Sequence, residues 1–69
     1  MDYKENTLSY DDYCRIRQSV GWTNFSKTQT EKSLEKSLYT VVANSDGQAV
    51  GMGRLIGDGM YYMIVDIVV

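Results

Sequence analysis

The sequence has 69 residues, a formal net charge of −2, one cysteine and no histidine. A chain of this length forms at most one small domain and buries only about 60% of the surface that it exposes when unfolded. One cysteine excludes an intrachain disulfide, and one thiol with scattered carboxylates does not make a zinc site. We therefore expect residues 1–69 to form a single domain or part of one, without a metal.

Charge and hydropathy patterning exclude three further classes. The basic residues are scattered and the net charge is negative, which argues against a nucleic-acid partner. The first twenty residues contain no apolar run typical of a signal peptide, and no stretch approaches the ~20 apolar residues of a membrane span. We expect a cytoplasmic protein that does not associate with membranes.

The segment from Ser9 to Gly21 predicts a helix, preceded by a weak strand pattern over residues 3–7. Ser9 is a favoured N-cap, two aspartates suit the first turn, and Gly21 suits the position just beyond a helix C-terminus. The apolar side chains at helical spacing are Tyr13, Ile16 and Val20, and Arg15 and Arg17 are expected on other faces.

A second, more polar helix is predicted to end near Ser37. Thr28 and Glu31 have capping-box spacing, and Ser26 is an alternative cap. The apolar face of this helix is thin and consists of Leu34 and Leu38. We expect it to be a surface cover.

The remaining sequence predicts three strands joined by tight turns. Residues 39–43 are β-branched and aromatic, Asp46-Gly47 favours a hairpin, and residues 48–57 follow. A second turn is expected at residues 57–59, and a third strand over residues 60–69. The order strand, helix, helix and three strands predicts an α+β fold, an antiparallel sheet with two helices packed on it.

The last predicted strand, residues 60–69, is apolar on both faces except at Asp66. Such a strand is normally central and covered on both sides, and an exposed apolar edge favours pairing or aggregation. We therefore expect a partner for this strand, either a missing C-terminal half or a second copy in a homo-oligomer, most simply a dimer.

Three stretches of the sequence carry a family resemblance. They are residues 38–43 (LYTVVA) with residues 50–59 (VGMGRLIGDG), residues 20–22 (VGW), and residues 64–69 (IVDIVV). Together, these stretches and their order along the chain resemble the N-terminal half of the GNAT superfamily of acyl-CoA N-acyltransferases. The resemblance covers nearly the whole chain and implies that residues 64–69 form the fourth strand of that fold.

The resemblance implies acetyl-CoA as the cofactor and a primary amine as the acetyl acceptor. It aligns Ile67, Val68 and Val69 with the strand whose backbone binds the acetyl and pantetheine groups, although a plain core strand is the alternative. The family then carries a Gln/Arg-x-x-Gly-x-Gly/Ala loop, which holds the pyrophosphate at a helix N-terminus. The sequence stops at Val69, before such a loop, so we expect the chain alone to be inactive.

Two charged residues in the predicted strands have open interpretations. Asp66 is a candidate catalytic base, and the alternative is a carboxylate bonded to the backbone or facing solvent. Arg54 could pair with Asp66 or contact an acidic ligand, and the alternative is a packed stem with its head in water.

Three other residues, all in the helical half of the sequence, have a functional and a structural interpretation. By resemblance, Trp22 and Phe25 border the acceptor-substrate pocket; alternatively, they plug the sheet. Cys14 lacks a histidine to activate it, so we expect a core thiol.

Gly51, Gly53, Gly57 and Gly59 do not have dinucleotide-binding spacing and are attributed to turns and close packing.

Two functions therefore remain open. One is the N-terminal portion of an acetyl-CoA-dependent N-acetyltransferase. The other is a small non-enzymatic module that oligomerises or binds a partner through its apolar last strand.

Overall fold

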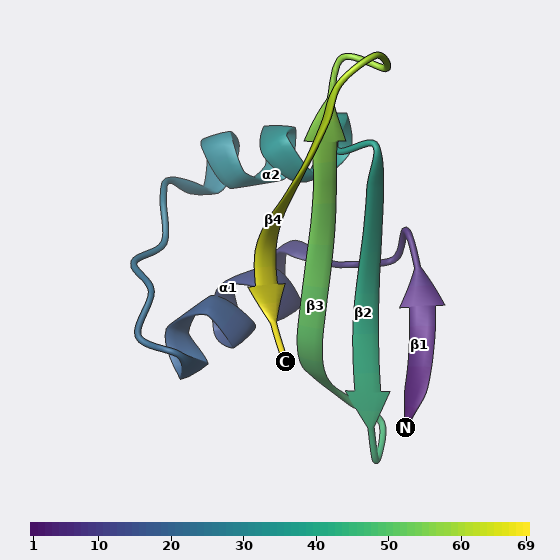
Figure 1. The fold of residues 1–69 in the computed structure, drawn as a ribbon. Helices are drawn as coiled ribbons and strands as arrows, with labels where there is room; N and C mark the ends of the chain where they lie inside the picture. Colours follow the sequence, from purple (N-terminus) through teal and green to yellow (C-terminus); the bar gives the residue numbers. More distant parts are fainter.

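A computed structural model describes all 69 residues (Figure 1). The elements in chain order are β1 (Asp2–Glu5), α1 (Tyr10–Ser19), α2 (Lys27–Lys36), β2 (Tyr39–Ser45), β3 (Gln48–Gly57) and β4 (Tyr62–Val68). The four strands form one antiparallel sheet in the order β1-β2-β3-β4, and both helices lie on the same face of it. The predicted α+β fold and its element order are confirmed. Neither helix is long and apolar enough to cross a membrane.

Helix α1 has the predicted caps. The Ser9 hydroxyl accepts a hydrogen bond from the backbone N–H of Asp12. At the other end Gly21 has a φ of 81°, and the N–H groups of Gly21 and Trp22 bond back to the carbonyls of Gln18 and Arg17. This pair of bonds is a Schellman motif, which glycine makes accessible because it tolerates positive φ.

The buried face of α1 differs from the prediction at two residues. Val20 is exposed because the helix ends at Ser19, so the side chain at position 20 no longer follows helical spacing. Arg17, which was expected on another face, is buried together with Tyr13 and Ile16. Arg17 lies one turn beyond Tyr13, so the same spacing that buries Tyr13 also directs Arg17 at the sheet.

Helix α2 begins after Ser26, whose hydroxyl accepts the N–H of Gln29, so the alternative cap is the one used. Leu34 packs against the core as predicted, but Leu38 lies beyond the helix and is exposed. The buried residue of this helix is Thr30. The thin apolar contact agrees with a helix that covers the sheet mainly through polar groups.

The hairpin between β2 and β3 forms where Asp46-Gly47 predicted it. Asp46 has a φ of 54° and Gly47 a φ of 77°, the pair of positive values of a two-residue type I′ turn. In the middle of β3, a Cβ on Gly51 would lie 2.8 Å from the carbonyl oxygen of Val68. Gly51 therefore allows β4 to approach β3 closely, as expected from packing rather than from nucleotide binding.

The second connection is longer than predicted. Met60 and Tyr61 were expected in the last strand, yet β4 begins at Tyr62. The Asp58 carboxylate accepts the N–H groups of both Met60 and Tyr61, at 2.9 Å each. These bonds lower the pKa of the Asp58 carboxyl, and the bond from Tyr61 has the larger effect. They take two donors that a strand ladder would otherwise use.

A β-bulge interrupts β4 at Asp66 and Ile67. Val65 pairs with Arg54 and Val68 pairs with Met52, so two residues of β4 lie opposite the single residue Gly53. Asp66 has a φ of 53°, in the left-handed region that aspartate tolerates better than most residues. Because of the bulge, Val65 and Asp66 both line the space beneath the helices, while Ile67 is exposed.

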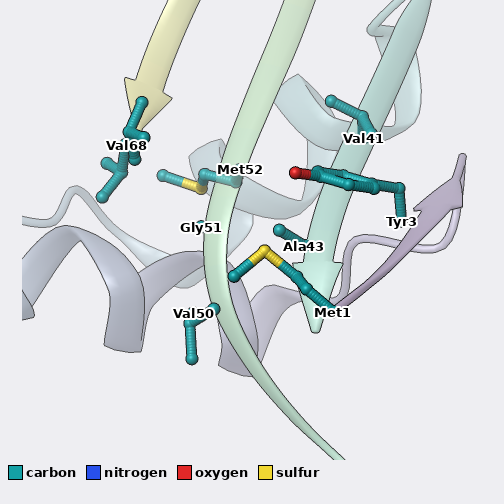
Figure 2. Close-up of a pocket in the computed structure, with 9 residues that line it drawn as sticks. Met1, Tyr3, Val41, Ala43, Val50, Gly51, Met52 and Val68 are labelled. Carbon is teal, nitrogen blue, oxygen red and sulfur yellow. The ribbon is translucent and has the colours of Figure 1, made fainter. Parts of the chain in front are cut away.

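The core lies between α1 and the sheet. Its buried apolar residues are Tyr13, Ile16, Val42, Ala49, Met52 and Val68. The opposite face of the sheet carries no helix. There Met1, Tyr3 and Val50 border an apolar depression of about 300 Å³, together with Val41 and Ala43 of β2 (Figure 2).

Candidate functional site

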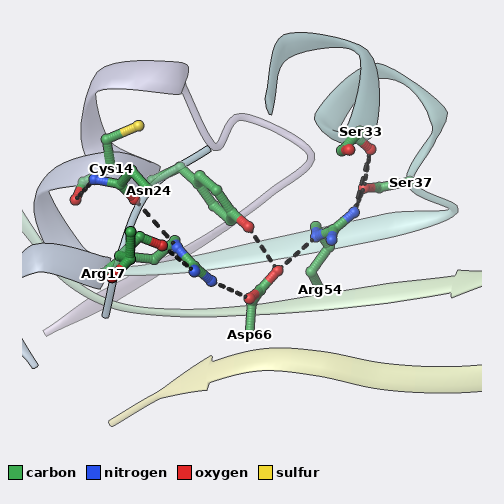
Figure 3. A network of polar contacts seen from close by, with 9 residues as sticks. Cys14, Arg17, Asn24, Ser33, Ser37, Arg54 and Asp66 are labelled. Atoms are coloured by element: carbon green, nitrogen blue, oxygen red, sulfur yellow. Dashed lines mark hydrogen bonds and ion pairs between the residues drawn. The ribbon is translucent and has the colours of Figure 1, made fainter. Parts of the chain in front are cut away.

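The site is centred on Asp66, the single charge within β4. One carboxylate oxygen accepts a bond from Arg17 Nη1 at 2.7 Å. The other accepts Arg54 Nε at 2.9 Å and the Tyr13 hydroxyl at 2.8 Å. Figure 3 shows the donors converging on this carboxylate, from α1 and from β3. We call Asp66, Arg17, Arg54 and Tyr13 the Asp66 cluster.

Arg17 ties the cluster to the loop between the helices. Its Nε donates to the Asn24 side chain and its Nη2 to the Thr23 carbonyl. The guanidinium also lies 5.2 Å from the Trp22 ring and 5.7 Å from the Phe25 ring, within cation–π range. The loop conformation therefore depends on Arg17.

Arg54 ties the same cluster to α2. Its Nη1 donates to the Ser33 carbonyl and to the Ser37 hydroxyl, which in turn donates to the Ser33 carbonyl. The pairing of Arg54 with Asp66, left open by the sequence, is present. Both helices are thus joined to β4 through one carboxylate.

The ion pairs of the cluster are largely shielded from water. The exposed fraction of the side chain is 11% for Arg17, 12% for Asp66 and 13% for Arg54. Removing one partner of a buried pair leaves an uncompensated charge, which costs about 3–5 kcal/mol. Asp66 is therefore a structural centre of the fold, whatever chemistry it takes part in.

Tyr13 has its hydroxyl in the same environment. Burial raises the pKa of Tyr13, and the hydrogen bond to Asp66 raises this pKa further. Both effects favour the neutral phenol, which is the form that donates to the carboxylate.

A cavity of about 200 Å³ opens beside the cluster. We call it the arginine cavity, because Arg17 and Arg54 contribute its cationic groups. Its other lining residues come from both helices, the loop and β4: Tyr13, Phe25, Gln29, Thr30, Ser33, Val65 and Asp66. The cavity is partly enclosed, and polar groups from several elements converge on it, so it is a candidate ligand site.

The predicted site residues fall in two places. Asp66 and Phe25 line the arginine cavity, and Trp22 stacks on Arg17 beside it. The side chain of Val68 is in the core, whereas Ile67 and Val69 are exposed. The backbone role of these three residues stays a prediction, as does the catalytic role of Asp66. Asp66 is bonded to side chains and not to the backbone or solvent; of these side chains, Arg54 was considered as a partner from the sequence, and Arg17 and Tyr13 were not.

Sequence reasoning missed Arg17 as a site residue. Its spacing of four from Tyr13 was the available signal, since residues so separated share a helix face. Cys14 packs partly buried against the core, in agreement with a core thiol. No group of three or more metal-ligating side chains gathers anywhere in the chain.

Comparisons with known proteins give one informative match. No protein-family model matches the sequence, and no curated protein does. A crystal structure of a protein of unknown function from meticillin-resistant Staphylococcus aureus, named a probable acetyltransferase, is similar with a TM-score of 0.84 and 34% identity. The match covers 96% of this chain and 50% of that chain, so the chain spans half the length of the solved protein.

The match covers nearly the whole chain and agrees with the resemblance carried by residues 20–22, 38–43 with 50–59, and 64–69. The chain has the fold of the N-terminal half of a GNAT-like acetyltransferase.

Proposed function

We propose that this chain is the acceptor-side portion of an acetyl-CoA-dependent N-acetyltransferase, which acetylates a primary amine when the fold is complete. The observation that supports the proposal most is the match to a probable acetyltransferase at 34% identity over 96% of the chain. A cytoplasmic location suits this cofactor and this reaction.

The residues present fit part of acetyl-CoA. β4 is the last strand of the sheet, so one of its edges has no neighbouring strand and is free to bind the amide groups of a pantetheine arm. The backbone of Ile67, Val68 and Val69 would hold this arm. These three residues lie at the end of a strand and not at a helix N-terminus, so they do not match the pyrophosphate. When bound, acetyl-CoA supplies the acetyl group as a reactive thioester.

The chain's own contribution is to place the acceptor amine next to β4. Phe25 and the Asp66 cluster border the arginine cavity, which also includes Val65 of β4. An amine whose other end lies in this cavity would reach toward the backbone of β4 at the bulge. Holding two reactants next to each other in the right orientation supplies much of the rate enhancement of group-transfer enzymes.

We assign Asp66 a positioning role in this function. Its two oxygens already accept bonds from Arg17, Arg54 and Tyr13, so a substrate ammonium would compete with all three for the carboxylate. Asp66 would instead fix the helices and the loop against β4. The general base is then expected elsewhere in the complete fold.

The test separates the chain from the complete fold. Acetyl-CoA and a panel of primary amines are incubated with the pure chain, with the half of the Staphylococcus aureus protein that it does not cover, and with both. We expect release of the coenzyme A thiol only from the mixture, with the intact Staphylococcus aureus protein as positive control. Release by the chain alone would contradict its inactivity, and no release from a mixture whose two parts bind each other would contradict the proposal.

Association through β4 is a second candidate function. Tyr62, Met63 and Ile64 at the start of β4 are exposed, and so is Ile67 after the bulge. A free strand edge with exposed apolar side chains favours strand addition from another chain. This function needs no cofactor and is tested by the oligomeric state.

A further inference from the structure

The charges of the Asp66 cluster do not balance. Arg17 and Arg54 both form ion pairs with Asp66, and neither has another ion-pair partner. Asp66 is also the only carboxylate among the residues that line the arginine cavity. Two guanidinium groups and one carboxylate leave one excess positive charge beside a space of about 200 Å³.

Arg54 has donors to spare at this cavity. Its Nε bonds to Asp66 and its Nη1 to Ser33 and Ser37, but its Nη2 makes no hydrogen bond within the chain. No buried side-chain nitrogen or oxygen of the protein lacks a partner, so Nη2 must be accessible to solvent. Since Arg54 lines the cavity, an anionic group placed there would find one unused guanidinium nitrogen.

The size and the walls of the cavity limit what it can hold. Ligand pockets usually measure about 300–1,000 Å³, so a space of about 200 Å³ takes only one end of a ligand. Phe25 lines the cavity and has 60% of its surface exposed, so the rest of a ligand would lie along this ring. A planar, singly charged carboxylate can accept a hydrogen bond from this nitrogen and matches the single excess charge.

We propose that the arginine cavity binds the carboxylate of the acceptor, so that the acceptor is an amine that also carries an acidic group. This inference rests on the proposed acetyltransferase function and narrows its substrate class. Arg54 is the residue that contacts the carboxylate, Phe25 packs on the apolar part of the acceptor, and Asp66 keeps both arginines in place.

The test compares probes that differ in charge and little in shape. The full chain, labelled with ¹⁵N, is titrated with 3-phenylpropanoate, with the neutral 3-phenylpropanamide, and with phenyl phosphate. NMR shifts of the Arg54 Nε–H and of the Phe25 and Gln29 backbone amides report binding. We expect the carboxylate to bind more tightly than its amide, by roughly fivefold at low salt, with the difference shrinking as salt increases.

Gln29 offers a variant that leaves the cluster intact. It lines the cavity but is exposed, and its backbone sits in the first turn of α2. Gln29→Glu should weaken the binding of 3-phenylpropanoate roughly threefold or more, while Gln29→Lys should make it bind more tightly. Because a glutamate at this position favours the helix, Gln29→Glu should not lower the stability of the protein. Thr28→Glu adds the same charge one residue away, outside the cavity, and is the matched control.

Each outcome decides the proposal. A carboxylate preference that Gln29→Glu reduces and Thr28→Glu leaves unchanged supports it. Equal binding of acid and amide, no shift at Arg54 with any probe, or tighter binding of phenyl phosphate would overturn the assignment to a carboxylate. None of these measurements uses acetyl-CoA, so failure of acetyl transfer and failure of carboxylate binding are read separately.

Discussion

The carboxylate of Asp66 lies 2.7 Å from the guanidinium of Arg17, although 49 positions separate the two residues in the chain. One belongs to the first helix and the other to the last strand. Arg17 also binds the interhelical loop, so this contact positions Trp22 and Phe25 relative to β4. The loop between the helices is thus held against β4 through a long-range ion pair.

Asp66→Asn should destabilise the protein severely. The substitution keeps the shape of the side chain but leaves Arg17 and Arg54 buried without a countercharge, which costs about 3–5 kcal/mol. Urea unfolding followed by circular dichroism measures the loss. Asp46→Asn is the matched control, because it removes the same charge in a turn that accepts asparagine equally well. Equal unfolding midpoints for the two variants would refute the central role of Asp66.

Tyr13→Phe should change how stability depends on alkaline pH. The raised pKa of Tyr13 in the folded state means that its contribution is fully present below the ordinary tyrosine value of about 10 and is lost as pH rises through the higher, folded-state pKa. The original protein should therefore be the more stable one at pH 7, with an advantage that narrows above pH 10. The pKa values of Tyr10 and Tyr39 are also raised, but both residues are present in both proteins, so their effects on stability cancel in the comparison.

Urea midpoints at several pH values between 7 and 11 check the Tyr13 prediction. A constant difference between the two proteins across this range would contradict it.

Gly51→Ala should weaken the contact between β3 and β4. The new methyl group would lie 2.8 Å from the Val68 carbonyl oxygen, so the backbone must shift, at a cost of about 1–3 kcal/mol. Gly53→Ala is the control on the same strand, since its methyl group would meet only the Val41 side chain at 3.4 Å. Thermal unfolding should give a lower midpoint for Gly51→Ala than for Gly53→Ala. The reverse order would show that β4 does not depend on this approach.

Ile67→Lys should reduce self-association. Ile67 is 53% exposed on the strand at the sheet edge, and a lysine there disfavours strand pairing. Size-exclusion chromatography with light scattering should show the original chain as a dimer or larger species and the variant as a monomer. Thr28→Lys, on the outer surface of α2, is the control for added charge. Identical masses for Ile67→Lys and the original chain would count against association through β4.

Val65 is a poorer position for the same experiment. From the sequence alone, Val65 and Ile67 are equally suitable positions, because both lie in the apolar run of residues 60–69. In the structure it is half-buried and lines the arginine cavity, so a lysine there would disturb the Asp66 cluster as well as the strand edge.

Local chemistry made much of the fold predictable. The Ser9 cap, the termination at Gly21 and the Asp46-Gly47 turn each depend on a few neighbouring residues, and all three are present. The second turn could not be bounded in this way. Its extra residues follow from the two backbone bonds to Asp58, and although aspartate favours such bonds in turns, its presence alone does not fix where the next strand begins.

The candidate site was predictable only in part. Asp66, Trp22 and Phe25 could be singled out as unusual residues, and the Arg54–Asp66 pair could be named as a possibility. Arg17, which connects them, could be placed on the face of the first helix that carries Tyr13, but its ion pair with Asp66 could not be predicted. Its partners lie on other elements, and burial of an arginine runs against the ordinary preference of this residue for the surface.

The bulge at Asp66 makes the number of residues in β4 matter as much as their identity. Val65 and Val68 enclose two residues, where an uninterrupted ladder against Arg54 and Met52 would enclose one. Deleting Asp66 would remove the carboxylate, and deleting Ile67 would place Asp66 opposite Gly53, on the face of the sheet away from the helices and from both arginines. A distant relative is therefore best aligned by counting positions between these two valines, because a gap placed there would move the carboxylate away from the helices.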